Sequence, residues 1–465
     1  MTPHAFPSAT AIGPAPASAA IPSGWTAAVL QRIRAATSTL NARLAAAPPE
    51  RLLSLCLALP AVPTEVAGQL GGDTRWCAPH GALRFNALDT AARFTGAQAV
   101  AESRHARHDW VHWGEAAVAP LMLFTAPPAT EPTQPSVRLP RALLRQGPDG
   151  THLILSARRG HATAAQLVDG WLDATGRLLA PAPADARWSR ITMQHATPDA
   201  DTWRARVDGA RQAIRAGRLD KVVLARRLQA TLSAPVDVGA ALRRLERMYP
   251  GCHVLSLPHA GGQLLAATPE PLALKRGDSL VAHALAGTAR RSGDAQADAR
   301  AVAALLASAK ERREHALVVE ALRTRLAGLC LRLEAAGDPA VLPLRFVQHL
   351  WTPVRGRLRA GVDLFDAVLA LHPTPAVLGL PDTAARAWLA ACGEQRDCLY
   401  TGVAGWTDRN GDGEAVVLLR SAWLAGTTAV LWAGAGIMAE SDPDAELAET
   451  ELKLKTMLEI LSSAP

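Results

Sequence analysis

The sequence predicts an α+β fold built from large antiparallel β-sheets with flanking helices. Short apolar segments recur along the 465 residues, and most neighbouring segments are separated by only a few residues. Connections this short join antiparallel strands, whereas parallel strands need long crossovers. Helical patterns of apolar residues accompany these segments, including one that closes the chain. The combination favours an α+β fold over a doubly wound parallel sheet.

The first half of the chain predicts one helix and then mainly short strands. Spaced apolar positions over residues 25–47 predict the helix. Between about 52 and 187 the apolar runs are short and are interrupted by proline and glycine. They include 52–59, 119–124 and 151–157, with a loop at 126–136.

The second half predicts helices and strands in alternating groups. A helix over 199–216 is ended by Gly217, a residue typical of helix C-termini. Further helices are expected at 236–248, 363–371, 383–391 and 443–461, and two helical stretches are expected over about 296–330. Strands are expected at 219–230, 252–257, 263–267, 271–275, 279–286, 345–351, 399–406, 414–424 and 428–433. We therefore divide the chain into a flexible Ala/Pro-rich leader (1–24), an N-terminal half that completes the sheets (25–190) and a catalytic region (195–462).

Composition excludes several classes of function. The chain has 49 Lys+Arg and 42 Asp+Glu residues, a net charge of +7. It contains no basic run with interleaved aromatic residues, so nucleic-acid binding is not expected. None of the six cysteines forms a CxxC pair, which argues against a zinc site or a redox dithiol. A disulfide framework is also unexpected at this length, so we expect a cytoplasmic protein. The sequence contains no apolar run of ~18 residues, so we expect no membrane span.

Two motifs resemble known binding sites, but the residues around them do not fit those sites. Residues 408–413 open like a calcium loop, but Leu419 stands where a bidentate glutamate is required, so a hairpin turn is expected. Residues 434–439 fit GxGxxA after a strand, but the helix starts later and is the last element. The glycines can still let backbone N–H groups approach an anion.

Three glutamates are candidate metal ligands. Glu446 and Glu449 share one face at the start of the last predicted helix, and carboxylates suit Mg²⁺. A solvated acidic helix start is the alternative. Glu314 lies on an apolar stripe of another predicted helix, where an unpaired charge is costly. It either binds a metal or forms a salt bridge to an arginine.

Three further side chains have the chemistry of a catalytic site. Lys221 shares a strand face with Val223, so it is either a desolvated base or a strand-end lysine that reaches solvent. Glu270 lies between two prolines at a strand turn and is either an acid with a raised pKa or an ordinary turn residue. Arg420 ends an apolar strand and can bind a carboxylate or form a structural pair.

Together these segments resemble the chorismate-utilising enzymes. The family's motifs occur here in order over about 199–461, whereas residues 1–190 contain none that we identify. They are DKVVLAR, ATPEPL, LAGTARR, KERREHALVV, VQHLWTPVRG, LHPTPAV, GDGEAVVLLR, LWAGAGI and SDPDAELAETELK. The resemblance implies that the sheets pack as a sandwich-like core.

The pattern is most similar to isochorismate synthases. Members of the family that add water carry the lysine found here as Lys221. Ala286 stands where aminodeoxychorismate synthases have a lysine, and Ala376 stands where salicylate synthases typically have threonine. Thr401 and Val403 depart from the common YAGPVGW pattern, and Leu378 replaces a small residue. A salicylate synthase and a non-catalytic chorismate-binding protein remain as alternatives.

The resemblance also implies a role for each site residue. Lys221 activates water and Glu270 protonates the departing hydroxyl, while Mg²⁺ holds the ring carboxylate. The implied partner is chorismate, and we expect a cytoplasmic monomer without an obligate protein partner that supplies salicylate, siderophore or menaquinone synthesis. The implied metal ligands are Glu314, Glu446 and Glu449, and the implied substrate-binding residues are Gly287, His349, Ala376, Tyr400, Arg420, Gly434, Gly436 and Lys453.

Overall fold

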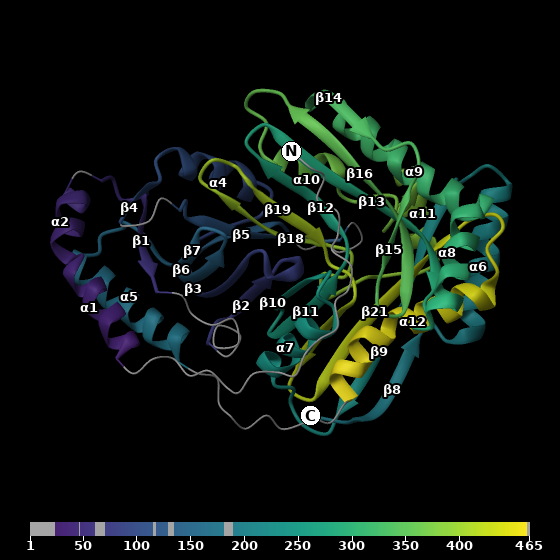
Figure 1. The fold of residues 1–465 in the computed structure, drawn as a ribbon, viewed down its shortest axis with the longest axis horizontal. Coiled ribbons are helices and arrows are strands. Elements are labelled where there is room, and N and C mark those ends of the chain that lie inside the picture. Colours follow the sequence, from purple (N-terminus) through teal and green to yellow (C-terminus); the bar gives the residue numbers. More distant parts are fainter. Residues whose placement is uncertain are drawn as a thin grey trace.

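The fold consists of one network of paired strands that splits into two sheets. A computed structural model of the chain describes residues 24–45, 47–60, 70–114, 118–128, 134–180 and 189–462. Almost all pairs in this network are antiparallel, and helices flank the strands (Figure 1), so the predicted α+β class is confirmed. The expected flexible leader, apart from Gly24, lies outside the described residues.

The first sheet connects the N-terminal strands to those near the C-terminus. Its order is β4–β1–β7–β6–β3–β2–β10–β11–β20–β21–β9, and both β8 and β17 pair with β9. Within the described segments, only β1 and β4 run parallel. The bounds are β1 (Leu52–Leu59), β2 (Thr74–Cys77), β3 (Arg84–Thr95), β4 (Val111–Gly114), β6 (Ser136–Gly147), β7 (Gly150–Arg158), β8 (Ile191–Thr197), β9 (Lys221–Leu232), β10 (His253–His259), β11 (Gly262–Thr268), β17 (Gly379–Leu380), β20 (Ser421–Ala425) and β21 (Thr428–Ile437).

The second sheet branches from β6. Its order is β6–β5–β18–β19–β12–β13–β16, and both β14 and β15 pair with β16. The bounds are β5 (Leu121–Ala126), β12 (Pro271–Arg276), β13 (Ser279–Arg290), β14 (Cys330–Ala335), β15 (Ala340–Pro343), β16 (Val347–Leu358), β18 (Val403–Asp408) and β19 (Gly413–Val417). Each sheet therefore contains strands from both halves of the chain.

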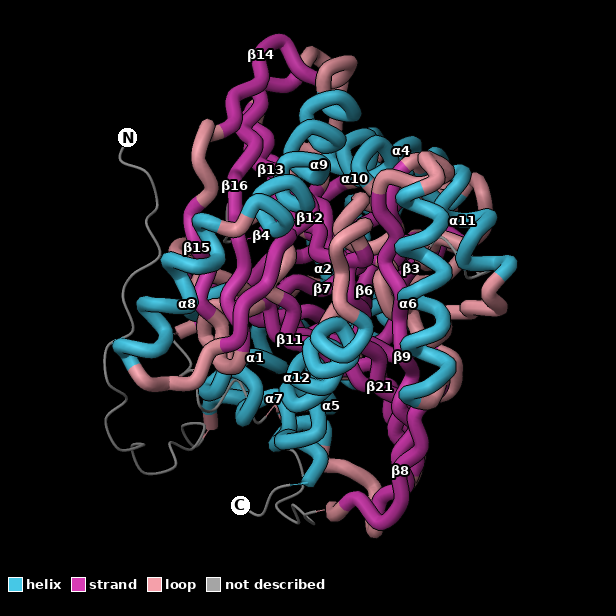
Figure 2. The backbone as a smooth tube through the Cα atoms, turned by 90° about the vertical axis from the view of Figure 1, so that its right-hand side faces the viewer, coloured by secondary structure: helices cyan, strands magenta, loops and turns pink. Residues whose placement is uncertain are grey.

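Helices cover the outer faces of both sheets. In Figure 2, α9 and α12 lie on the side that faces the viewer, and they pack on β13 and β21 respectively. In the part of the chain that the structure describes, no helix is long and apolar enough to cross a membrane. The bounds are α1 (Trp25–Ala35), α2 (Thr37–Ala45), the 3₁₀ turn η1 (Pro79–Gly81), α4 (Ala99–His108), α5 (Ala164–Leu179), α6 (Ala200–Arg215), α7 (Val238–Met248), α8 (Ala295–Ala307), α9 (Ala309–Leu326), α10 (Leu364–Leu371), α11 (Asp382–Ala391) and α12 (Pro443–Ser462).

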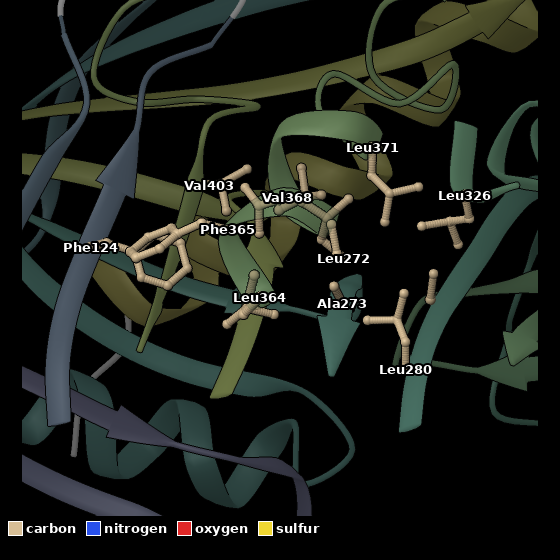
Figure 3. Close-up of a cluster of buried hydrophobic side chains, with 14 of the residues drawn as sticks. Phe124, Leu272, Ala273, Leu280, Leu326, Leu364, Phe365, Val368, Leu371 and Val403 are labelled. Carbon is tan, nitrogen blue, oxygen red and sulfur yellow. The ribbon is translucent and has the colours of Figure 1, made fainter. Parts of the chain in front are cut away.

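The largest buried cluster lies where α9 and α10 pack on the second sheet. Figure 3 shows part of it, with Phe124 of β5 beside Phe365 of α10. Their rings meet edge to face with centroids 4.9 Å apart, a favoured aromatic geometry. Because α9 also carries Glu314, this packing fixes one wall of the site described below.

Several predicted elements differ from the structure. The helix expected over 25–47 is two helices, separated at Ala36. The strand expected over 414–424 is interrupted: β19 ends at Val417 and β20 begins at Ser421, and Arg420 between them has a left-handed backbone (φ 49°) that departs from extended strand geometry. The strand expected over 399–406 begins only at Val403. Helices α4 and α5 and strands β14 and β15 were not expected, and β14 begins at Cys330, which was placed in a helix.

Both excluded motifs have the alternative structure that we expected. The turn at 408–413 joins β18 to β19, and the Asp408 carboxylate accepts hydrogen bonds from the N–H groups of Asn410 and Asp412. Gly434 and Gly436 lie inside β21 and do not begin a helix.

Candidate active site

A cavity of about 690 Å³, partly open to solvent, lies between β9 and β21 of the first sheet and β13 and β16 of the second. Helices α9 and α12 contribute to its wall. Every predicted site residue except Glu446 lines it, namely Lys221, Glu270, Gly287, Glu314, His349, Ala376, Tyr400, Arg420, Gly434, Gly436, Glu449 and Lys453.

Two glycines open the floor of the cavity. Gly436 pairs with Val223 and Gly434 with Ala225, so all four positions face the same side of the sheet. A Cβ on Gly436 would lie 2.5 Å from Glu314 Oε1 and 2.9 Å from Lys221 Cε. The Lys221 side chain therefore lies in space that any residue larger than glycine at position 436 would occupy.

Lys221 and Glu314 form a buried ion pair. Lys221 Nζ lies 2.8 Å from Glu314 Oε1, and Lys221 is 1% exposed. Burial alone would raise the pKa of Glu314, but the Lys221 ammonium overcomes burial and lowers it. The interpretation of Lys221 as a solvent-reaching lysine is therefore wrong. The partner of Glu314 is also this lysine and not an arginine.

Glu270 is buried without a partner for its carboxyl group. It is 5% exposed, and its side chain makes no hydrogen bond within the described residues. Burial raises its pKa to about 7, although Lys221, Lys453 and Arg420 oppose the shift. Glu270 thus differs from an ordinary turn residue, because it can hold a proton near neutral pH and release it.

Arg420 and His349 form a hydrogen-bonded pair at another wall. Arg420 Nη2 lies 3.2 Å from His349 Nε2. A guanidinium can only donate, so Nε2 accepts and Nδ1 carries the proton, towards Gly287 O or Thr288 Oγ1. Burial, followed by the Arg420 charge, lowers the pKa of His349 well below its usual value, which keeps the ring neutral.

Within the described residues, Arg420 has no carboxylate partner, although it is only 9% exposed. A buried guanidinium without a counter-ion is costly unless a ligand supplies the charge. Among the described residues Arg420 therefore pairs with His349 and with no carboxylate, which leaves its other N–H groups available to an anion.

Tyr400, Trp432 and Lys453 complete this side of the cavity. The Tyr400 ring stacks on Trp432 with centroids 5.5 Å apart. Lys453 Nζ donates to Gly434 O at 2.8 Å and lies 2.6 Å from Glu449 Oε1, one helical turn earlier. Lys453 thereby ties α12 to the glycine floor.

Glu446 lies outside the cavity lining. Burial, followed by the charge of Glu449, raises its pKa. Lys310 Nζ lies 3.0 Å from Glu446 and 3.3 Å from Glu311. Within the described residues, no three acidic, histidine or cysteine side chains are arranged to hold a metal. Each of the three predicted ligands, Glu314, Glu446 and Glu449, faces a lysine instead.

Sequence reasoning missed several residues of the site. Trp432 could have been predicted, because it is two residues from Gly434 in the same strand and therefore lies on the same face. Lys310 and Arg396 gave no signal, since their partners are distant in the sequence. Thr401 was noted only as a departure from the motif, yet it lines the cavity.

The comparisons with known proteins agree with this geometry. The model of the family described as chorismate binding enzyme matches residues 80–462. A Pseudomonas aeruginosa protein named salicylate biosynthesis isochorismate synthase is 41% identical over 56% of this chain, and the match spans 55% of that protein, about half its length. Isochorismate synthase EntC of Escherichia coli is 36% identical, over 58% of this chain and 69% of its own.

A solved structure extends the likeness to the N-terminal half. The menaquinone-specific isochorismate synthase MenF of Escherichia coli aligns with a TM-score of 0.77 and 26% identity. The alignment covers 92% of this chain and 99% of the MenF chain. With the family model matching well over half of its residues, the chain belongs to the chorismate binding enzyme family.

Proposed function

We propose that this chain is an isochorismate synthase, which converts chorismate to isochorismate reversibly. The observation that carries the proposal is that Lys221 and Glu270 line one buried cavity beside Arg420, which has no carboxylate partner among the described residues. Relatives that bear the name of this activity are 36% and 41% identical over more than half of the chain. The reaction makes it an isomerase.

The proposed chemistry adds water at C2 of the ring while the C4 hydroxyl departs. Lys221 Nζ takes a proton from the attacking water, and Glu270 gives one to the departing oxygen, so a water molecule leaves as another adds. The raised pKa of Glu270 supports its role as the acid. Lys221 accepts a proton only as a neutral amine, so its ammonium must first leave Glu314 and give up a proton to solvent through the open side of the cavity.

We propose that the two carboxylates of chorismate bind at different ends of the cavity. The enolpyruvyl carboxylate would contact Arg420, Tyr400 and the backbone near Gly434 and Gly436. Arg420 supports this placement, because among the described residues no carboxylate neutralises it. His349, Gly287, Ala376 and Lys453 would shape the pocket around the ring.

Mg²⁺ is the proposed cofactor, held by Glu314, Glu446 and Glu449 directly or through water. Carboxylate oxygens are the donors that Mg²⁺ prefers, and the pKa of Glu446 is raised partly by repulsion from Glu449, which a cation relieves. The three lysine contacts of these glutamates would be exchanged on binding. When bound, Mg²⁺ supplies positive charge for the ring carboxylate.

We further propose that the enzyme acts as a cytoplasmic monomer. All six cysteines are free thiols, four of them buried, as in a reducing compartment. The names of the relatives point to salicylate, siderophore or menaquinone synthesis as the use of the product.

The decisive experiment identifies the product. Purified protein with chorismate and Mg²⁺ near neutral pH should form isochorismate with little salicylate, as separated by chromatography. Adding a separate isochorismate–pyruvate lyase should then yield salicylate and pyruvate together. Glu270→Gln, which retains the shape of the side chain, is the matched inactive control. Stoichiometric salicylate from the protein alone would instead identify a salicylate synthase, and no chorismate consumption would refute the proposal.

A further inference from the structure

Thr401 has a buried hydroxyl at the cavity wall. The residue is 3% exposed, and it lines the cavity between Tyr400 and the segment that contains Ala376. Arg396 Nη1 lies 3.3 Å from Thr401 Oγ1 and also donates to Val377 O at 2.5 Å. One guanidinium nitrogen therefore holds the Thr401 hydroxyl beside the Ala376–Val377 wall.

The direction of the hydroxyl proton follows from Arg396. A guanidinium has only donors, so Thr401 Oγ1 must accept the hydrogen bond from Arg396. The Thr401 hydroxyl is thus left to donate its own hydrogen elsewhere. Within the described residues it has no acceptor. Since Thr401 lines the cavity, a bound ligand is the available acceptor.

The local backbone is built at a cost to present this side chain. Thr401 has φ 64°, and a β-branched residue in the left-handed region is a strained outlier. The turn is nevertheless fixed: Thr401 N–H donates to Leu418 O at 2.9 Å and Gly402 N–H donates to Leu399 O at 2.9 Å. Strain retained at a binding wall is typical of a functional position.

The support behind Thr401 is rigid as well. Arg396 and Glu394 form an ion pair at 2.8 Å in which both side chains are 2% exposed. Arg396 also donates to Val223 O, and Glu394 accepts from Ala225 N–H. Both contacts lie on β9, which carries Lys221. Through Arg396, the position of the Thr401 hydroxyl is therefore fixed relative to β9, the strand that carries Lys221.

We infer that Thr401 is a further substrate-binding residue, whose hydroxyl donates a hydrogen bond to the carboxylate of the enolpyruvyl group. This inference rests on the proposed function. Thr401 directly follows Tyr400, which is proposed to contact that carboxylate. Ala376, which also lines the cavity, has no hydrogen-bonding side chain. A hydroxyl donor suits an anionic oxygen at this end of the cavity.

Binding of two related probes separates this contact from general damage to the site. The probes are 3-(1-carboxyvinyloxy)benzoate, which carries the enolpyruvyl group, and 3-hydroxybenzoate, which lacks it. Thr401→Val keeps the shape and removes the hydroxyl. It should weaken the first probe about tenfold or more and change the second less than about twofold, measured by titration calorimetry.

Three further variants complete the test. Thr401→Ser retains the hydroxyl and should bind the first probe nearly as the wild type does, and Thr401→Ala provides a second deletion if Thr401→Val misfolds. Thr374→Val is the matched control, because Thr374 has a buried hydroxyl without a partner but does not line the cavity. It should leave both affinities unchanged.

Each remaining outcome refutes a defined claim. Equal affinity of wild type and Thr401→Val for the first probe, or an equal loss for both probes, would overturn the role of Thr401 while leaving the proposed function intact. If the wild type neither binds the first probe nor converts chorismate, the proposed function fails and the inference about Thr401 fails with it.

Discussion

Replacing Gly436 by alanine tests whether the Lys221–Glu314 pair is the centre of the chemistry. Gly436 lies in β21 and has no positive φ, so alanine can adopt its backbone without strain. The added Cβ would lie 2.5 Å from Glu314 Oε1, 2.9 Å from Lys221 Cε and 3.2 Å from Lys221 Nζ. One methyl group therefore displaces both members of the pair, because its three nearest atoms all belong to Lys221 and Glu314.

The size of the effect follows from two opposing contributions. Alanine lowers the entropy of the unfolded chain and stabilises the fold by about 0.4–1 kcal/mol. Opening a buried ion pair costs about 3–5 kcal/mol, so the net loss of stability reaches about 2–4 kcal/mol if the pair opens fully. A base displaced by ~1 Å loses about 100-fold in rate. We therefore expect kcat to fall about 100-fold, while KM changes much less.

The assay is chorismate consumption with product identification, together with a thermal unfolding curve. Gly176→Ala is the matched control, because a Cβ there meets nothing within 4 Å. It lies in α5, where alanine is favoured over glycine by about 1 kcal/mol, so it should raise Tm slightly and leave kcat unchanged. A Gly436→Ala enzyme with kcat within about threefold of the wild type would refute the claim that this pair carries the chemistry.

Three other predictions concern protons and charge. If protonated Glu270 is the acid, kcat falls as pH rises through about 7. The folded pKa of Glu270 exceeds its unfolded value, so its contribution to stability is full below pH ~4.5 and is lost as pH rises through about 7. Glu270→Gln should therefore be inactive, yet have a higher Tm than the wild type at pH 8. Excess EDTA should abolish turnover and Mg²⁺ should restore it; full activity in EDTA would contradict the ligand roles of Glu314, Glu446 and Glu449. Lys221→Met should be inactive and about 3–5 kcal/mol less stable in denaturant titrations, since it leaves Glu314 buried and unpaired. Adding Glu314→Gln should recover stability but not activity, and recovery of both would exclude Lys221 as the base.

Sequence periodicity predicted the elements that carry the site well. Alternation along 219–230 placed Lys221 on the face of Val223, and the structure has both residues in the cavity. The segment around Glu314 was identified as a helix with an acid on its apolar stripe. These predictions depend only on local patterns that a strand or helix repeats. The family resemblance, and not periodicity, brought Tyr400, His349 and the two floor glycines together.

Other features could not be predicted, because tertiary contacts determine them. The break at Arg420 directly follows the apolar run 415–419, and the left-handed backbone of Arg420 has no signal in the residue type. The short strands β14 and β15 are mostly exposed, so they lack the apolar alternation that identifies a strand. The lysines that contact Glu314 and Glu446 come from other elements, so the sequence spacing does not reveal these pairs.

The charges around the cavity show why a divalent cation belongs in the proposal. Lys221 and Lys453 are neutralised by Glu314 and Glu449, His349 is neutral, and Glu270 is protonated below about pH 7. Among the charged residues that line the cavity, Arg420 alone is left, with a charge of +1. Chorismate carries two carboxylates, so one of them would enter a buried site without a counter-charge, which is costly. Under the proposed function, Glu314 and Glu449 would hold a second cation, and its charge would remove that cost. Glu314 would then exchange its contact with Lys221 for the cation, which would separate Lys221 from its carboxylate partner.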